Sequence, residues 1–264
     1  MKRLDIPLMH PAISINEMKS GDEDALAAMT GGFHPFTPVV PSGGGQRLLF
    51  GVDRRSPEMD YRIAIHEAGH VTVGRALGQL IGGTTIEPGE NYSGATWGIN
   101  SDPSSFFSSE ETIATCAALS SLMPAFGEPR DDVAVELVQT HGRVIELLAG
   151  TESERQLYPA PPLNAPHDIA EARANASLIC CSPAAVEAFI AYARVEAAEL
   201  IRVHRPAVLA IANALVAHRT LNGVQIDAII ADAASRQALL LEHQRRAMVG
   251  RAVTAAASFR CGND

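Results

Sequence analysis

The chain of 264 residues is poor in aromatic side chains and in cysteine. Only 5% of its residues are aromatic while 47% are hydrophobic, a balance that favours closely packed helices over a β-sandwich. The cysteines show no zinc-ribbon spacing and are too few for a disulfide framework at this length; they are Cys116, Cys180, Cys181 and Cys261. We therefore expect reduced thiols and a cytoplasmic protein.

Long apolar runs and an excess of positive charge are also missing. No apolar run reaches the roughly 18 residues that a membrane helix needs, so we expect no membrane span. Asp5, Pro7 and Pro11 interrupt any apolar signal segment at the N-terminus. The formal net charge of −9 argues against nucleic acid as a partner, because phosphate binding needs a basic surface. The glycine run at 43–45 is not a phosphate-binding loop, because no Lys-Ser/Thr follows it.

The most informative residues are His66-Glu67-Ala68-Gly69-His70, which follow the pattern H-E-x-x-H of zinc peptidases. Residues four apart on a helix share one face, so His66 and His70 can direct two imidazole nitrogens at one ion. Zinc binds such nitrogens at roughly 2.0–2.1 Å. Glu67 lies one step round the helix, where it can deprotonate a water on the metal and protonate a leaving amine. The alternative is a pair of ordinary histidines on a half-buried helix.

The flanking residues predict that this pattern lies on a helix. Ser56, Pro57 and Glu58 provide an N-cap, a first-turn proline and a first-turn acid. Apolar residues then recur at helical spacing as far as Val73, and Gly78 is a stop signal. We expect a helix of about 20 residues, which is the setting that metal binding by this pattern requires.

The rest of the chain predicts a mainly α fold with a small β-hairpin or sheet (α+β), as in a zincin-like helical metallopeptidase domain. The expected strands cover residues 84–87 and 95–99 and form a hairpin. The hairpin could offer an edge to which an extended peptide adds as a further strand. Alternatively, it has only a structural role, with Trp97 in the core. Helices are expected at 108–126, 132–148, 166–179 and 183–217 with a break near Pro206, and residues 224–234 are expected to start the last helical segment. Residues 150–162 and 221–223 are expected to be a loop and a turn.

The expected helices and strands divide the chain into three parts. Residues 1–55 are expected to form an N-terminal arm, because prolines and glycines break any periodicity there. Residues 56–253 would form the zincin-like peptidase domain, and residues 254–264 a frayed C-terminal tail.

A catalytic zinc site also needs a third protein ligand and one open position. Glu110 or Glu111 on a following helix is conceivable, and the best candidate is Asp168. Asp168 could equally be a first-turn acid that stabilises a helix dipole, so the residues alone leave its role open. His167 is the rival ligand, but neighbours on a helix point about 100° apart, so only one of the two should face the metal.

Several segments together resemble the peptidase domain of FtsH-type membrane AAA proteases. They are His66–His70, Thr85-Ile86-Glu87-Pro88, Gly94-Ala95-Thr96, His167-Asp168-Ile169 with Ala172, and Thr220–Ile226, within roughly residues 57–232. The resemblance implies zinc as cofactor, His66, His70 and Asp168 as its ligands, and Glu67 as the catalytic base. The family's pair of glutamates before a Phe-Gly is missing at residues 119–127, and an insertion is indicated near residues 130–162.

The expected function is zinc-dependent hydrolysis of peptide bonds. Because the family's ATPase module and membrane helices are missing, the substrate should be a short or unfolded polypeptide, or one delivered by a separate unfoldase or adaptor. A homo-oligomer is compatible with the sequence. The first alternative is a metal-retaining but catalytically weak binding or regulatory module, which the missing glutamates favour. The second alternative is a structural helical protein without metal.

Overall fold

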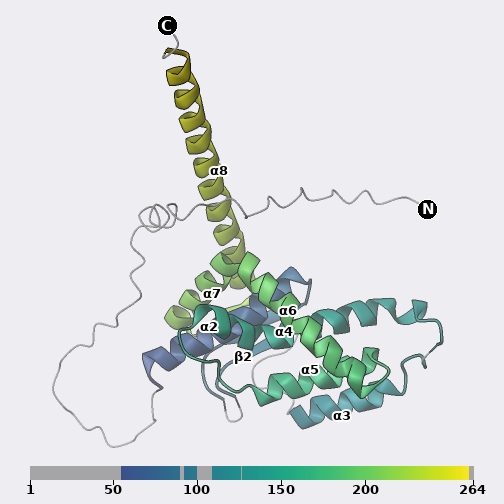
Figure 1. Ribbon diagram of the computed structural model, residues 1–264. Helices are drawn as coiled ribbons and strands as arrows, with labels where there is room; N and C mark the ends of the chain where they lie inside the picture. Colours follow the sequence, from purple (N-terminus) through teal and green to yellow (C-terminus); the bar gives the residue numbers. More distant parts are fainter. Residues whose placement is uncertain (1–54, 90–91, 100–108, 126, 262–264) are drawn as a thin grey trace, which may run out of the picture. The chain divides into compact units, whose positions relative to one another are not determined.

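The computed structural model describes residues 55–89, 92–99, 109–125 and 127–261 (Figure 1). The chain divides into the units Met1–Val52 and Asp53–Asp264, and every described residue belongs to the second unit. This unit is mostly helical and carries one small antiparallel sheet, which confirms the expected mainly α composition. The expected N-terminal arm, except Arg55, lies outside the described residues.

Helix α2 (Pro57–Ala76) runs through the centre of the unit. The hydroxyl of Ser56 accepts a hydrogen bond from the Met59 N–H, and Pro57 occupies the first turn, as predicted. The helix ends just before Gly78, whose φ of 76° is a left-handed conformation that glycine adopts without strain. All but one of the residues from Ile63 to Gly74 are buried, so α2 is a core helix rather than a surface helix.

The sheet contains β1 (Ile81–Thr85), β2 (Ala95–Gly98) and β3 (Thr220–Asn222) in the order β2-β1-β3, with both pairings antiparallel. Strand β1 begins three residues before the predicted strand. Glycine is uncommon in strands, so residues 82 and 83 gave no strand signal in the sequence. A side chain at Gly83 would lie 2.4 Å from the ring of Trp97, which packs there half-buried. Strand β3 was expected to be a turn, since three residues are too few to show alternation.

The other helices follow α2 along the chain. They are α3 (Ser109–Ser120), α4 (Ala134–Leu157, preceded by the short 3₁₀ helix η2, Asp131–Val133), α5 (Pro166–Ile179), α6 (Pro183–Val203), α7 (Arg205–His218) and α8 (Gly223–Cys261). Of these, α4, α6 and α7 pack against α2. The chain breaks at His204, two residues before Pro206, and so forms two helices there.

Three predicted boundaries were wrong. Helix α3 ends at Ser120 instead of 126, and α4 runs nine residues past Leu148, through most of the expected loop. Gly150, the first residue of the expected loop, lies inside α4. Helix α8 runs to Cys261, through the expected tail. Its start is fixed by reciprocal hydrogen bonds between Asn222 and Gln225, a capping box.

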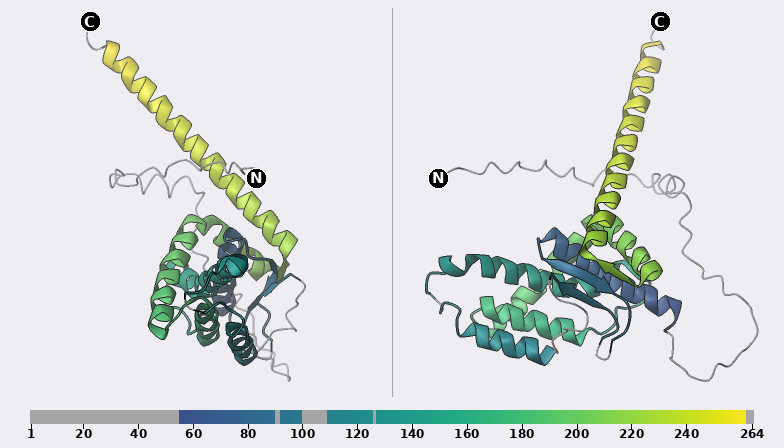
Figure 2. Two further views of the ribbon diagram at one scale, coloured as in Figure 1. Left: turned by 90° about the vertical axis from the view of Figure 1, so that its right-hand side faces the viewer. Right: turned by 180° about the vertical axis from the view of Figure 1, so that it is seen from behind.

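Helix α4 organises the packing of the unit. It packs against α2 on one side and against α5 and α6 on the others, while α7 covers another face of α2 (Figure 2). The largest fully buried apolar side chains of this core are Ile65, Val71, Val73, Ile86, Val144, Ile145, Ile201, Ile211, Leu215, Leu221 and Ile226. Among the described residues no single helix is long and apolar enough to cross a membrane, and only α5 with α6, bent by 119°, meets that test as a pair.

Candidate metal centre

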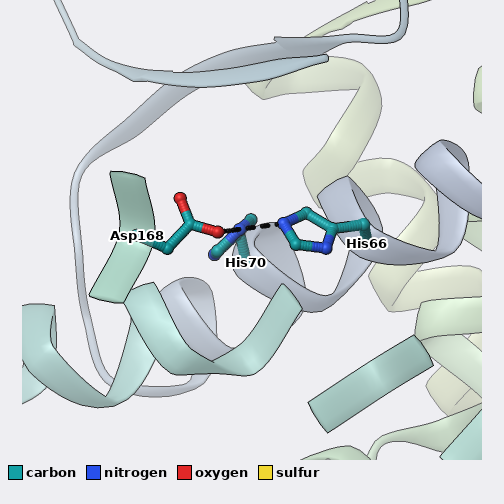
Figure 3. Close-up of side chains that lie close together, drawn as sticks. All are labelled: His66, His70 and Asp168. Atoms are coloured by element: carbon teal, nitrogen blue, oxygen red, sulfur yellow. Dashed lines mark hydrogen bonds and ion pairs between the residues drawn. The ribbon is translucent and has the colours of Figure 1, made fainter. Parts of the chain in front are cut away.

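Two histidines from α2 and one aspartate from α5 meet at a single point (Figure 3). Nε2 of His66 lies 3.1 Å from Oδ2 of Asp168, and Nε2 of His70 lies 3.5 Å from the same oxygen. One ligand atom from each residue lies within 4.8 Å of the other two. The structure thus brings together the three predicted metal ligands, and the group contains Asp168 rather than its neighbour His167.

These distances fit a metal ion. Bonds of about 2.05 Å at tetrahedral angles place two ligand atoms about 3.3 Å apart. The separations of 3.1 and 3.5 Å from the Asp168 oxygen lie on either side of that value. Two imidazoles and a carboxylate are also a donor set typical of zinc and related transition metals. Two of the three separations thus match a metal site, and the group could hold an ion.

Gly150 of α4 keeps the point between the histidines open. A methyl group on Gly150 would lie 2.4 Å from Nε2 of His70 and 2.5 Å from Nε2 of His66. Because metal–nitrogen bonds are roughly 2.0–2.1 Å long, that methyl group would occupy the space of the ion. The close approach continues at Gly69 of α2, where a Cβ would lie 2.7 Å from the Ala149 carbonyl oxygen. Two glycines thus let α4 form a wall of the site.

Helix α4 also orients both imidazole rings. Nδ1 of His66 donates to Oε1 of Glu154 at 2.8 Å, and Nδ1 of His70 donates to the Glu146 carbonyl oxygen at 2.8 Å. Each hydrogen bond places the proton on Nδ1 and directs Nε2 toward the shared point. The carboxylate and carbonyl partners of metal-binding histidines commonly have this role.

The carboxylate of Glu154 is completely buried and connects three segments. Besides His66 it accepts hydrogen bonds from Nε of Arg62 at 2.6 Å and from the Leu163 N–H at 3.0 Å. Arg62 also donates to the Pro161 carbonyl, so the segment that leads into α5 is fixed to α2. Burial raises the pKa of Glu154, but these donors outweigh burial and lower it. Glu154 could not be identified from the sequence, because residues 150–162 were expected to be a loop.

Glu67 lies beside the three ligands and faces strand β2. Its side chain is buried, and Oε2 accepts a hydrogen bond from the Thr96 hydroxyl at 2.9 Å. A side chain at Gly94 would come within 2.7 Å of Oε1, so the glycine allows β2 to approach the carboxylate. Burial raises the pKa of Glu67, against the opposing influence of His70 and His66. This carboxylate is thus held apart from the ligand set, in a place where it can accept a proton.

The electrostatics of the centre favour a positive charge at the shared point. Burial lowers the pKa of His66, but hydrogen bonds to Asp168 and Glu154 outweigh burial and raise the pKa to about 10. Burial raises the pKa of Asp168, yet hydrogen bonds from His66 and His70 hold that pKa well below its usual range. The surrounding carboxylates therefore stabilise a cation on or between the imidazoles.

An ion pair joins α4 to α5 close to the ligands. Arg143 of α4 donates to Glu146 at 2.6 Å and lies 3.5 Å from Glu171 of α5. Glu171 is one helical turn after Asp168, and the Glu146 carbonyl holds His70. Arg143 thus connects the turn of α5 that carries the aspartate to the turn of α4 that orients a histidine.

Comparison with models of known protein families finds no match for this chain, and comparison with curated proteins finds no similar one.

Proposed function

We propose that the chain is a zinc-dependent metallopeptidase that hydrolyses peptide bonds in unfolded or short polypeptides. One observation carries the proposal. Ligand atoms of His66, His70 and Asp168 converge, and the buried carboxylate of Glu67 lies next to this group without being one of its members. Three protein ligands with a position left for water or substrate are typical of catalytic zinc sites, whereas structural sites use four. The resemblance of the sequence to the FtsH-type peptidase domain, and with it a zincin-like fold, supports the same function.

The residues of the centre have separate roles in such a reaction. A zinc ion held by His66, His70 and Asp168 would polarise the scissile carbonyl and acidify a water molecule. Glu67, whose Oε2 accepts a hydrogen bond from the Thr96 hydroxyl, would take the proton of the attacking water. It would then donate this proton to the departing amine, and its raised pKa makes it a stronger base than an exposed glutamate.

The substrate class follows from what accompanies the centre. The resemblance to the FtsH-type peptidase domain supports a polypeptide substrate, and these 264 residues contain no phosphate-binding loop. We propose that the substrates are short peptides, unfolded chains, or proteins delivered in the cytoplasm by a separate unfoldase or adaptor.

A second candidate is a metal-retaining module that binds or regulates without useful hydrolysis. The absence of a glutamate pair at residues 119–127 favours it. However, Glu154 supplies a buried carboxylate against His66, and the Glu146 carbonyl supports His70. Because both histidines have a partner that orients them, we favour the catalytic function.

The test combines metal content with hydrolysis. The full-length chain should contain about one zinc ion by elemental analysis and should cleave a reduced, carboxymethylated protein carrying quenched fluorophores. Glu67→Gln should keep the zinc and lose at least roughly 100-fold in turnover, because the base is removed. His70→Ala should lose both zinc and turnover. Glu136→Gln, an exposed change on α4, is the matched control and should alter neither.

The two alternatives give different results. A native chain that binds zinc but cleaves no unfolded substrate would be the binding module, as would unchanged residual turnover in Glu67→Gln. A native chain that takes up no zinc after dialysis against the ion would be a structural protein, and the metallopeptidase proposal would be wrong.

A further inference from the structure

Helix α8 continues far beyond the part that packs against the rest of the unit. Its first turns contact α7, β1 and β3, and Ile226 and Ala233 are buried there. From Ala234 to Val253 no residue is buried, and the helix leaves the other described helices in all three views (Figures 1 and 2). The 28 residues after Ala233 extend about 42 Å at 1.5 Å per residue.

This projecting part of α8 has a large apolar surface. Its exposed large apolar side chains are Leu239, Leu240, Leu241, Met248, Val249 and Val253, with exposed fractions between 40% and 64%. Helices in proteins gain most of their stability from packing, and exposed apolar patches of this kind mark contact surfaces. The projecting helix therefore needs a partner.

The sequence spacing identifies the partner as another helix. Small and large residues recur at alternating intervals of four and three, and we call them the heptad stripe: Ala234, Ala238, Leu241, Arg245, Met248 and Ala252. An average interval of 3.5 residues keeps a stripe facing one partner helix along a left-handed coiled coil. Contact with a membrane or a flat protein surface does not require an average spacing of 3.5 residues.

We propose that the part of the heptad stripe from Leu241 to Ala252 pairs with the same part of a second copy of this chain, with the two helices antiparallel. In that arrangement Leu241 of one copy lies opposite Ala252 of the other, and Arg245 lies opposite Met248. Within this stretch every large side chain meets a small or slender one, so the helices keep one separation there. A parallel pair would stack leucine on leucine and alanine on alanine, which require different separations.

The single charged member of the stripe is compatible with this pairing. Arg245 donates to Glu242 of its own helix at 2.7 Å, which offsets its charge, and its aliphatic stem can cover the Met248 opposite. A polar residue at one stripe position also fixes the register of a coiled coil at some cost in stability. A contact of this length lies at or below the lower end of specific interfaces, which bury roughly 1,200 Å² or more in total. We therefore expect a reversible dimer.

Sedimentation of the full-length chain over about 1–200 μM tests the pairing. The mass should rise from 28.0 kDa to twice that value as the concentration increases. Leu241→Glu and Met248→Glu should each weaken the dimer at least about 10-fold, since each places a charge in the apolar contact. Leu240→Glu, adjacent in sequence but off the stripe, is the matched control and should leave the dimer intact. Unchanged circular dichroism and metal content show that each variant is folded.

Disulfide trapping tests the direction of the helices. The double variant Leu241→Cys with Ala252→Cys should give a covalent dimer under mild oxidation, beyond any background from the native cysteines. Leu241→Cys alone should not, because residue 241 meets residue 252 in an antiparallel pair. A monomer at every concentration, including one that binds anionic vesicles instead, would overturn the proposal. So would a dimer that Leu241→Glu leaves unchanged, or a covalent dimer from Leu241→Cys alone.

Discussion

Gly150 is the residue whose lack of a side chain matters most for the centre. We expect Gly150→Ala to abolish metal binding, because its methyl group would lie 2.4–2.5 Å from both Nε2 atoms, in the space of the ion. Elemental analysis and a metal-free melting curve measure the two effects separately. Gly142→Ala on the same helix is the control, since its methyl group meets only the flexible amide of Gln79 and should leave metal content unchanged.

Glu154 is the residue that connects the imidazole of His66 to the buried interior. We expect Glu154→Gln to weaken metal affinity roughly 10- to 100-fold with little change in fold, because the amide keeps the shape but removes the charge opposite His66 and Arg62. Competition with a chromogenic chelator measures this affinity. Glu152→Gln, whose buried carboxylate pairs with Arg155 and not with a metal ligand, should bind metal like the native chain. Equal affinities for the two variants would contradict the role of Glu154.

At the scale of single residues, the sequence allowed only the local part of the centre to be predicted. His66, Glu67 and His70 are recognisable because one helical turn brings them together. Asp168 lies 102 positions from His66, so no spacing rule could place it, and only the family resemblance selected it over a helix-dipole role. Glu154 went unnoticed because its function depends on how α4 packs on α2, which no local pattern expresses.

At the scale of elements, helix ends with side-chain caps were predictable and those set by packing were not. Ser56, Pro57 and Gly78 determine the ends of α2 through local hydrogen bonds and backbone preferences. In α4 a loop was expected from Gly150 onward, although close approach to α2 requires a glycine there. The helical spacing that continues to Leu157, with no proline before Pro159, was the available signal for the longer helix.

Arg143 joins helices α4 and α5 by pairing with Glu146 and Glu171. We expect Arg143→Ala to weaken metal affinity by about 10-fold, because the turn that carries Asp168 loses its tie to α4 through Glu171. Arg143→Lys should recover part of the loss. The control is Arg173→Ala, which removes an exposed pair between α5 and α6 and should change little. If Arg143→Ala and Arg173→Ala lose metal affinity to the same extent, the Arg143–Glu171 ion pair has no special role in the centre.

At the scale of the whole described unit, the ligands come from helices that α4 holds together. Helix α2 carries both histidines and α5 carries the aspartate, and each packs on α4. The orienting groups of α4 are present in the fold itself, so the centre is arranged before any ion binds. A site preorganised in this way binds an ion without having to fold around it, unlike a zinc finger.

Metal removal should therefore lower stability without unfolding the protein. An ion at 100 times its dissociation constant adds about 2.7 kcal/mol. For a unit of this size that corresponds to a melting temperature roughly 5–10 °C higher. We expect chelation to reverse this shift and to leave the far-ultraviolet circular dichroism at 25 °C unchanged. His70→Ala should melt at one temperature with or without zinc. Loss of helical signal on chelation would instead show that the ion is needed to build the fold, and that the centre is not preorganised.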